Sequence, residues 1–320
     1  MFIYHKRASL YVFISICSLH NSPLHCTFSL EKVTSFLKVT PHQIVEQKKY
    51  DASSISTLII KNISGSITIV TKSSPDPLQA TIFMQATKKA QTHELCQEIR
   101  IGSLIDQSTL RIFTNDSPTS HAGTVDYHLI VPTTLTLILE TEKGDICTED
   151  THGALTATSS KGSITCSNSH HTVTAQVKES GSITIEQAYK PIYASTKKGT
   201  ITIHDAADTI TACAHKGKIN AHCSALPHHG YINLKTETGA IALHIPAATQ
   251  ATVNAHTTHG TVTSDHLITL LPHKTRLNVH AWNTFKKEVH GVLGTTPQPN
   301  SSIVLSSLNG NIKILDSITG

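Results

Sequence analysis

A glycine followed two residues later by isoleucine or valine recurs along this chain of 320 residues, and nine of these pairs define a repeat. The nine pairs are Gly65/Ile67, Gly144/Ile146, Gly162/Ile164, Gly181/Ile183, Gly199/Ile201, Gly217/Ile219, Gly239/Ile241, Gly260/Val262 and Gly310/Ile312. From the second pair to the sixth, successive glycines are 18, 19, 18 and 18 residues apart; the next two intervals are 22 and 21, and the last is 50. Such a period predicts a repeat architecture, in which each unit buries its apolar side against the next.

Each unit of the repeat reads as strand, tight turn, strand. Leu155 and Ala157 alternate with polar residues before Gly162. Ile164 and Cys166 alternate in the same way after it. Period-two alternation predicts strands, and the glycine permits a sharp turn between them. We therefore expect an all-β fold: a single β-solenoid, similar to a parallel β-helix, with two-strand rungs of about 18 residues and a right-handed coil.

The N-terminus differs in composition from the repeat. Lys6 and Arg7 precede an apolar run over residues 8–19, which has the form of a secretory signal. We expect a signal segment over 1–28, a linker over 29–50 and a solenoid domain over 51–320, with regular rungs over 135–265 and a capping insertion over 272–301. Cleavage or lipidation of the signal segment stays open.

Residues 51–140 depart from the regular repeat. The run 86–98 predicts a short helix, and the runs 78–86, 99–101, 110–113 and 125–131 predict strands, with a loop over 115–123.

Composition excludes several classes of protein. Charged residues make up 15% of the chain, and the net charge of +4 is not gathered into a basic stripe, which argues against a nucleic-acid partner. There is no apolar run of about 18 residues, so we expect no transmembrane span beyond the signal segment. The seven cysteines form no CxxC pair, which is unlike a zinc ribbon and is typical of small buried apolar residues.

One stretch resembles a known family. Residues 125–132 form a strand that ends in Val-Pro, and Thr141 begins a Thr-x-x-Gly-Asp-Ile rung. Together with the later Gly-x-Ile rungs and the closing strand pair over 303–314, this resembles the bacterial putative-adhesin family of β-strand-repeat proteins, a domain of unknown function. The similarity covers roughly 55–315. It implies a β-solenoid that is often exported or membrane-linked and that has no catalytic residues.

Histidine is the one unusual source of chemistry, with 22 residues. The densest groups near expected turns supply the metal candidates His222, Cys223, His228 and His229, since imidazole and thiolate suit Zn²⁺ or Cu²⁺. Measured against the following glycine, however, histidine positions vary: His170 lies 11 residues before its glycine, and no consistent ladder forms. The alternative is that these histidines are polar turn residues, and we assign no metal and no cofactor.

No catalytic arrangement is evident. Asp145, Glu179, Asp205 and Asp208 occupy different places in their units, and no nucleotide-binding, protease or hydrolase motif occurs. We expect a non-enzymatic protein, exported to the periplasm, outer envelope or cell surface, that binds an unknown surface protein or glycan through its solenoid faces. Two alternatives stay open: an internal scaffold that self-associates end to end, and a His-rich, metal-binding periplasmic module.

Overall fold

The computed structural model describes residues 42–72, 81–115, 123–271, 287–296 and 298–317. The expected signal segment, 1–28, lies outside these residues, as does most of the expected loop over 115–123. Within the described residues the chain forms 25 strands and one short helix, arranged in two mainly parallel sheets. The predicted all-β solenoid is confirmed. Its handedness stays a prediction.

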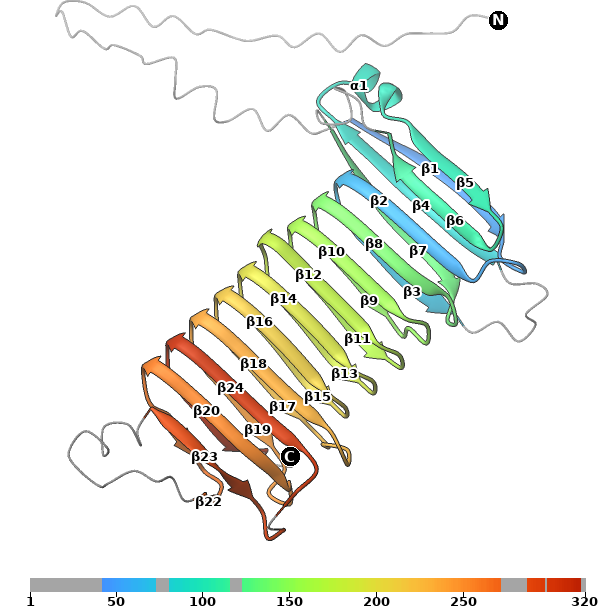
Figure 1. Ribbon diagram of the computed structural model, residues 1–320. Helices are drawn as coiled ribbons and strands as arrows, with labels where there is room; N and C mark the ends of the chain where they lie inside the picture. Colours follow the sequence, from blue (N-terminus) through green and yellow to red (C-terminus); the bar gives the residue numbers. More distant parts are fainter. Residues whose placement is uncertain (1–41, 73–80, 116–122, 272–286, 297, 318–320) are drawn as a thin grey trace, which may run out of the picture. The chain divides into compact units, whose positions relative to one another are not determined.

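Each rung consists of a strand in the 13-stranded sheet, here sheet B, a turn at a repeat glycine, and a strand in the 12-stranded sheet, here sheet A (Figure 1). The first strands of the rungs are β2 (Thr57–Ser64), β8 (Thr136–Lys143), β10 (Leu155–Lys161), β12 (Val173–Ser180), β14 (Ile192–Lys198), β16 (Ile210–Lys216), β18 (Tyr231–Thr238), β20 (Ala251–His259) and β24 (Ser302–Asn309). The second strands are β3 (Ile67–Lys72), β9 (Ile146–Glu149), β11 (Ile164–Ser169), β13 (Ile183–Ala188), β15 (Ile201–Ala206), β17 (Ile219–Cys223), β19 (Ile241–Ile245), β21 (Val262–Ser264) and β25 (Ile312–Asp316).

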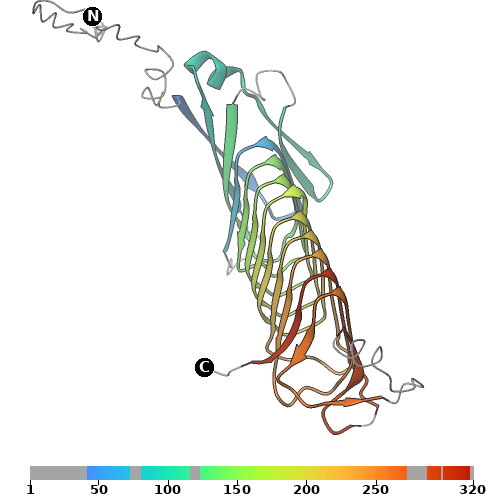
Figure 2. The same cartoon turned by 90° about the vertical axis from the view of Figure 1, so that its left-hand side faces the viewer.

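Neighbouring rungs pair in parallel, so that equivalent residues lie above one another. Ile183 pairs with Ile164 on one side and Ile201 on the other. In sheet B, Ala175 pairs with Ala157 in the same manner. These inward side chains are buried between the two sheets, which face each other across a narrow core (Figure 2). No single rung could bury this surface alone, so stacking is what stabilises each one.

The turn inside each rung brings glycine backbones into direct contact. Gly181 has a φ of +146°, and a Cβ there would lie 2.0 Å from the carbonyl oxygen of Gly162. Gly199, with a φ of +151°, has the same relation to Gly181, at 2.1 Å. A side chain is therefore excluded by conformation and by space together.

A buried column of polar residues lies beside the glycine turns. Most of its members are Ser or Thr residues whose hydroxyl donates to the glycine carbonyl of the neighbouring rung, as Thr196 does to Gly181 at 3.0 Å. The six hydroxyl donors are Thr141, Ser159, Thr196, Thr236, Thr257 and Ser307. Val177 and Ala214 occupy the same column without a donor. The hydroxyls satisfy carbonyls that would otherwise face the apolar core.

The order of rungs along the N-terminal end differs from their order in the sequence. Strand β6 (Thr109–Thr114) pairs with β2, and β7 (Gly123–Pro132) pairs with β3, on the side away from β8 and β9. The first rung of the sequence, β2–β3, is therefore enclosed between two later ones.

The C-terminal end repeats this arrangement. The last strand pair, β24–β25, lies between β18–β19 and β20–β21, although those two rungs follow each other in the sequence. Strand β23 (Glu288–Leu293) then pairs with β20 in the antiparallel sense, and β22 (Ile268–Leu270) pairs with β23. Both lie at the edge of sheet B. Residues 272–286 of the expected capping insertion, including Trp282, lie outside the described residues.

Two expectations for the N-terminal region are wrong in part. The expected linker, 29–50, contains strand β1 (His42–Asp51), which pairs antiparallel with β4 (Thr81–Ala90). The expected helix over 86–98 is the end of β4 followed by α1 (His93–Glu98). Charged residues are the reason that β1 and the last residues of β4 were not predicted as strands, because Lys88 is buried only through an ion pair of 2.9 Å to Glu46 of β1.

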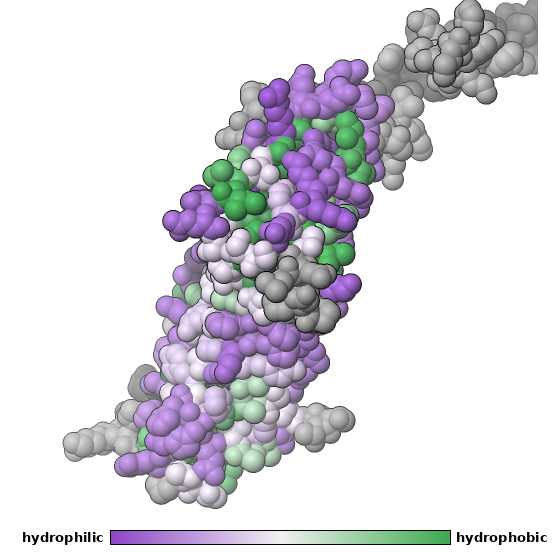
Figure 3. All heavy atoms as spheres, turned by 90° about the vertical axis from the view of Figure 1, so that its right-hand side faces the viewer, coloured by the Kyte–Doolittle hydropathy of each residue, from purple (hydrophilic) through white to green (hydrophobic). Residues whose placement is uncertain are grey.

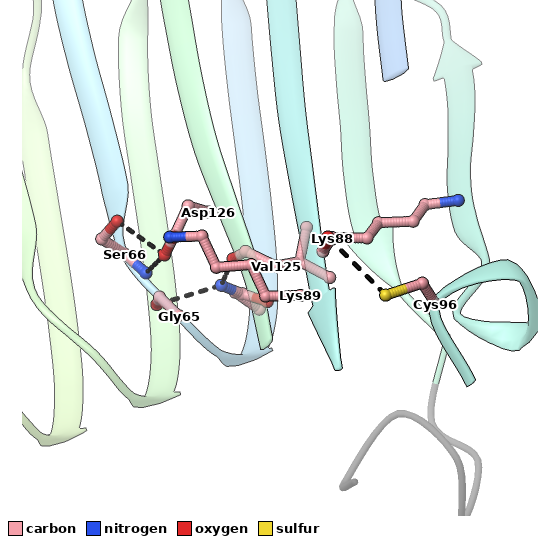
Figure 4. Close-up of polar contacts among 8 residues, drawn as sticks. Gly65, Ser66, Lys88, Lys89, Cys96, Val125 and Asp126 are labelled. Atoms are coloured by element: carbon pink, nitrogen blue, oxygen red, sulfur yellow. Dashed lines mark hydrogen bonds and ion pairs between the residues drawn. The ribbon is translucent and has the colours of Figure 1, made fainter. Parts of the chain in front are cut away.

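Antiparallel strands close the N-terminal end of the stack. Sheet A continues from β7 to β4 and β1, and sheet B continues from β6 to β5 (Ile101–Asp106). Asp126 of β7 fixes the junction, because its carboxylate accepts hydrogen bonds from the Ser66 amide at 2.8 Å and from Lys89 at 2.6 Å (Figure 4). These bonds join strand β4 to the first rung.

Candidate functional site

The outer faces of the two sheets carry short columns of half-buried polar residues. On sheet A, Thr165, Thr184 and Thr202 lie in register, and Asn220 continues the column. Ala242 ends it. β-branched residues at such positions suit a half-exposed strand, so the column has a structural explanation. The flat faces nevertheless present hydrogen-bonding groups at the regular spacing of the strands.

A polar hollow of about 290 Å³ opens on the outer face of sheet B near the glycine turns. Its lining comes from the ends of β2, β6, β8, β10 and β12 and includes Lys61, Glu140, Thr158, Ser160 and Lys178. Lys61 and Glu140 form an ion pair of 3.0 Å. Hydroxyl, ammonium and carboxylate groups together can donate to and accept from a ligand that is rich in hydroxyls.

A second feature lies where four sheet A strands end, or just beyond. Asp150, Asn168, Gln187 and Asp205 all have positive φ values, between 52° and 56°. Each is the sixth residue after its rung's glycine, so they form what we call the corner column. Asn and Asp adopt this left-handed conformation more readily than most residues. The corner column turns the chain out of sheet A.

The corner column places Asp150 beside two histidines from successive loops. The Nε2 atom of His152 lies 3.5 Å from Oδ1 of Asp150, and Nε2 of His170 lies 4.0 Å from the same oxygen. One ligand atom from each of the three residues lies within 4.8 Å of the others. We call this group the Asp–His cluster. It is the only such three-residue group of potential metal ligands found among the described residues.

The residues chosen from the sequence as metal candidates do not meet. His222 faces outward and forms an ion pair of 3.0 Å with Asp205. Cys223 points into the core, where burial raises the pKa of its thiol to about 11. His228 and His229 lie together in the loop before β18, with ring centroids 4.5 Å apart. The four residues therefore supply no common site.

The sequence did contain a signal for the Asp–His cluster. Measured from the preceding glycine, His152, His170 and Tyr189 are each eight residues on. His152 and His170 therefore occupy equivalent positions in two successive rungs, which distances to the following glycine do not reveal. The next rungs carry Tyr189 and Ala207 there, so the pair does not extend into a ladder. The loops vary in length, whereas the distance from the glycine to the corner column is six residues in each of these four rungs.

The acidic residues considered for catalysis each have a separate local partner. Asp145 accepts from the Ser163 amide at 2.7 Å, and Glu179 pairs with Lys161 at 3.1 Å. Asp208 accepts from the amide of Thr209. They do not converge on one point, as the paired carboxylates of a glycosidase would.

Apolar side chains are exposed at the N-terminal end of the stack. Leu104 and Ile105 of β5 are 56% and 53% exposed, and Phe113 of β6, which pairs with Gly102, is 37% exposed. The face drawn in Figure 3 is mainly hydrophilic, with hydrophobic residues gathered toward this end. None of the helical segments in the described chain has the length and apolarity needed to cross a membrane.

Among known proteins, the chain is similar to several solved structures. No protein family matches the sequence, and no curated protein matches it. A putative adhesin from Bacteroides fragilis is similar over 86% of this chain and 97% of its own, with 11% identity and a TM-score of 0.40. A putative adhesin from Parabacteroides distasonis has the same coverage, with 10% identity and a TM-score of 0.36. A putative cell adhesion protein from Clostridium sporogenes is similar over 87% of this chain and 100% of its own, with 10% identity and a TM-score of 0.27. The resemblance noted from the sequence thus also appears in the names of similar structures.

Proposed function

We propose that the protein is an exported, non-enzymatic binding protein of the cell envelope or surface, and that it attaches to a glycan or protein through the outer faces of its rungs. The observation that carries the proposal is the polar hollow on sheet B, where side chains from five strands offer donors and acceptors together. The rigid stack beneath holds these groups at fixed spacings, which lowers the entropy cost of binding.

A glycan is the ligand class that the hollow favours. Lys61, Glu140 and Thr158 line it with groups that hydrogen-bond to sugar hydroxyls. A protein partner would instead require a larger contact, on the order of 800 Å² from each partner.

A panel of immobilised polysaccharides tests the binding face. We expect Thr158→Arg, which places a long side chain in the hollow, to lower binding at least about tenfold. Thr184→Arg, on the outer face of sheet A, separates the two faces: it should leave binding at the hollow unchanged, and an equal loss in both variants would extend the binding surface to sheet A. Equal binding by wild type and the Thr158 variant would remove the hollow from the proposal. Binding only to protein-coated surfaces would favour a protein ligand.

The compartment is tested on intact source cells. We propose that residues 1–28 are a signal segment and that the remainder is displayed outside the cytoplasm. Protease shaving and mass analysis of the N-terminus should release fragments from intact cells and show a first residue beyond about residue 18. A protected protein that keeps Met1 would contradict export and favour the internal scaffold.

A further inference from the structure

We propose that the Asp–His cluster, Asp150, His152 and His170, is a binding site for one divalent transition-metal ion that accepts imidazole and carboxylate ligands, such as Zn²⁺ or Cu²⁺. This inference stands independently of the glycan proposal, since the cluster lies just beyond the C-terminal ends of β9 and β11 in sheet A and the hollow lies on sheet B.

The distances are close to those that one ion requires. With bonds of about 2.1 Å, two ligands of a tetrahedral Zn²⁺ lie about 3.4 Å apart. The two histidine nitrogens lie 3.5 and 4.0 Å from the carboxylate oxygen. The third separation is within 4.8 Å, and small rotations of the half-exposed side chains bring it into range.

The backbone holds the three residues in place on adjacent turns of the coil. The amide of His152 donates to the Thr133 carbonyl at 2.9 Å, and the amide of His170 donates to the Thr151 carbonyl at 2.8 Å. The Asp150 amide donates to the Ser167 carbonyl at 3.0 Å. A bound ion would therefore join two consecutive loops that the ladder has already aligned.

Two further residues orient the ligands. The side-chain amide of Asn168 donates to Oδ1 of Asp150 at 2.6 Å. The ring of Tyr189 stacks on His170, with centroids 4.7 Å apart and an angle of 18° between the planes. Outer partners that fix ligand orientation in this way are typical of metal sites.

The two histidine rings lie side by side next to one carboxylate. Their centroids are 4.3 Å apart. One metal ion placed between them can accept a nitrogen from each ring. Nitrogen ligands also select against Ca²⁺ and Mg²⁺, which prefer oxygen. Three protein ligands leave at least one position of the ion open to water or a partner group.

Calorimetric titration of the full chain, without a histidine tag and stripped of metal by a chelator, tests the site. We expect about one Zn²⁺ per chain at the tightest site and no comparable binding of Mg²⁺. His152→Gln/His170→Gln should weaken this site at least about a hundredfold, and Asn168→Ala should weaken it about tenfold. The matched control is His228→Gln/His229→Gln, which removes two adjacent histidines elsewhere and should leave the affinity unchanged.

Electron paramagnetic resonance of the Cu²⁺-loaded chain gives a second readout. Two imidazole nitrogens should couple to the copper in the wild type and in the control variant, and not in the His152/His170 variant. Unfolding of each variant in the presence of chelator checks that the exposed substitutions leave the fold intact. Absence of a stoichiometric Zn²⁺ site, or equal affinity in the two double variants, would overturn the proposal.

Discussion

At the scale of single residues, the stacked repeat glycines determine the backbone conformation of the turn in each rung. Each repeat glycine touches the backbone of the glycine in the next rung, so the turn cannot move away from an added side chain. The close approach also aligns the carbonyls that the buried hydroxyls satisfy.

Gly199→Ala is expected to destabilise the protein by about 3 kcal/mol or more, because it combines a positive φ with contact against a backbone oxygen. Gly102→Ala is the control. There the added methyl meets only the ring of Phe113, which is partly exposed and can rotate, so the cost should stay near about 1 kcal/mol. Urea unfolding followed by circular dichroism measures both. Equal losses would contradict the steric explanation.

A substitution in the buried column of Ser and Thr residues beside the glycine turns should stabilise the protein. Ala214 lies in register with Thr196 and Thr236, whose hydroxyls donate to glycine carbonyls at 3.0 and 2.9 Å. We expect Ala214→Ser to donate to the Gly199 carbonyl in the same way and to raise the free energy of unfolding by up to about 1 kcal/mol.

The reverse change, Thr196→Ala, should lower the free energy of unfolding by about 1–2 kcal/mol, since it removes a hydrogen bond and leaves a carbonyl unsatisfied. The same urea measurement applies to both variants. A destabilised Ala214→Ser protein would show that the core has no room for the hydroxyl.

The sequence predicts the glycine turns but not the buried hydroxyl groups beside them. The Gly-x-Ile pairs predicted the rungs because every unit needs the same turn. The buried Ser and Thr residues also form a sequence pattern, because one of them lies three residues before most of the repeat glycines, such as Thr141 before Gly144. This pattern does not predict burial, since Ser and Thr are ordinary residues of exposed strands, and only the structure shows them facing inward.

At the scale of elements, the enclosed last rung has a larger role than a terminal strand pair normally has. Strand β24 pairs with both β18 and β20, and β25 pairs with both β19 and β21. Removing this rung therefore breaks two interfaces in each sheet instead of one.

A chain ending at residue 299 should lose amide protection in β18 and β20 together, measured by hydrogen exchange. A synthetic peptide of residues 300–317, added in excess, should restore protection by occupying the same position. Protection of β18 that survives the truncation would mean that β20 closes onto it directly.

The N-terminal cap should be sensitive to acid. Partial burial raises the pKa of Asp126, but hydrogen bonds from Lys89 and Ser66 outweigh this and hold it below the ordinary 3.8. For Glu46, ion pairs with Lys88 and Lys48 similarly outweigh burial and hold its pKa below 4.5. Since folding lowers both values, the ionised carboxylates stabilise the folded state at neutral pH, and this stabilisation is lost as the pH falls through the folded pKa values.

We expect the urea midpoint to decrease as the pH is lowered from about 6 to about 3. The decrease should be less steep for Asp126→Asn, because this variant should already be about 1 kcal/mol less stable than the wild type at pH 6. Asp316→Asn, at the exposed end of β25, is the control and should keep the steeper wild-type dependence. An unchanged slope in the Asp126 variant would assign the acid sensitivity to other groups.

The ends of the stack were harder to predict than its middle. In the regular part of the stack, each rung contacts a unit about 18 residues away, and these contacts produce a period that can be read from the sequence. The pairing of β2 with β6, or of β24 with β20, joins segments about 50 residues apart and leaves no period. Strand β1 was overlooked for a related reason, because its charged residues find partners only after β4 has folded beside it.

At the scale of the whole molecule, the antiparallel caps protect a stack whose ends would otherwise offer unpaired strand edges. Strand β1 carries Glu46, Lys48 and Lys49 at the edge of sheet A, and charge at an edge opposes pairing with another chain.

Truncation tests this protection. A chain lacking residues 1–52 exposes the edge of β4 and should associate into larger species in light scattering at micromolar concentration. A chain lacking only residues 1–41 keeps β1 and should retain the size of the full chain. Identical behaviour of the two truncated chains would show that β1 does not prevent association through the edge of sheet A.

The enclosed position of β24–β25 also sets the order of events while the chain is being made. Translation runs from the N-terminus, so the rungs β18–β19 and β20–β21 leave the ribosome well before the segment that belongs between them. The edges of these rungs that will receive β24–β25 must stay unpaired, or pair wrongly, until residues 302–316 emerge. The native stack is therefore complete only after β24 and β25 have been synthesised, and a chain that terminates before them lacks an interior layer of the stack.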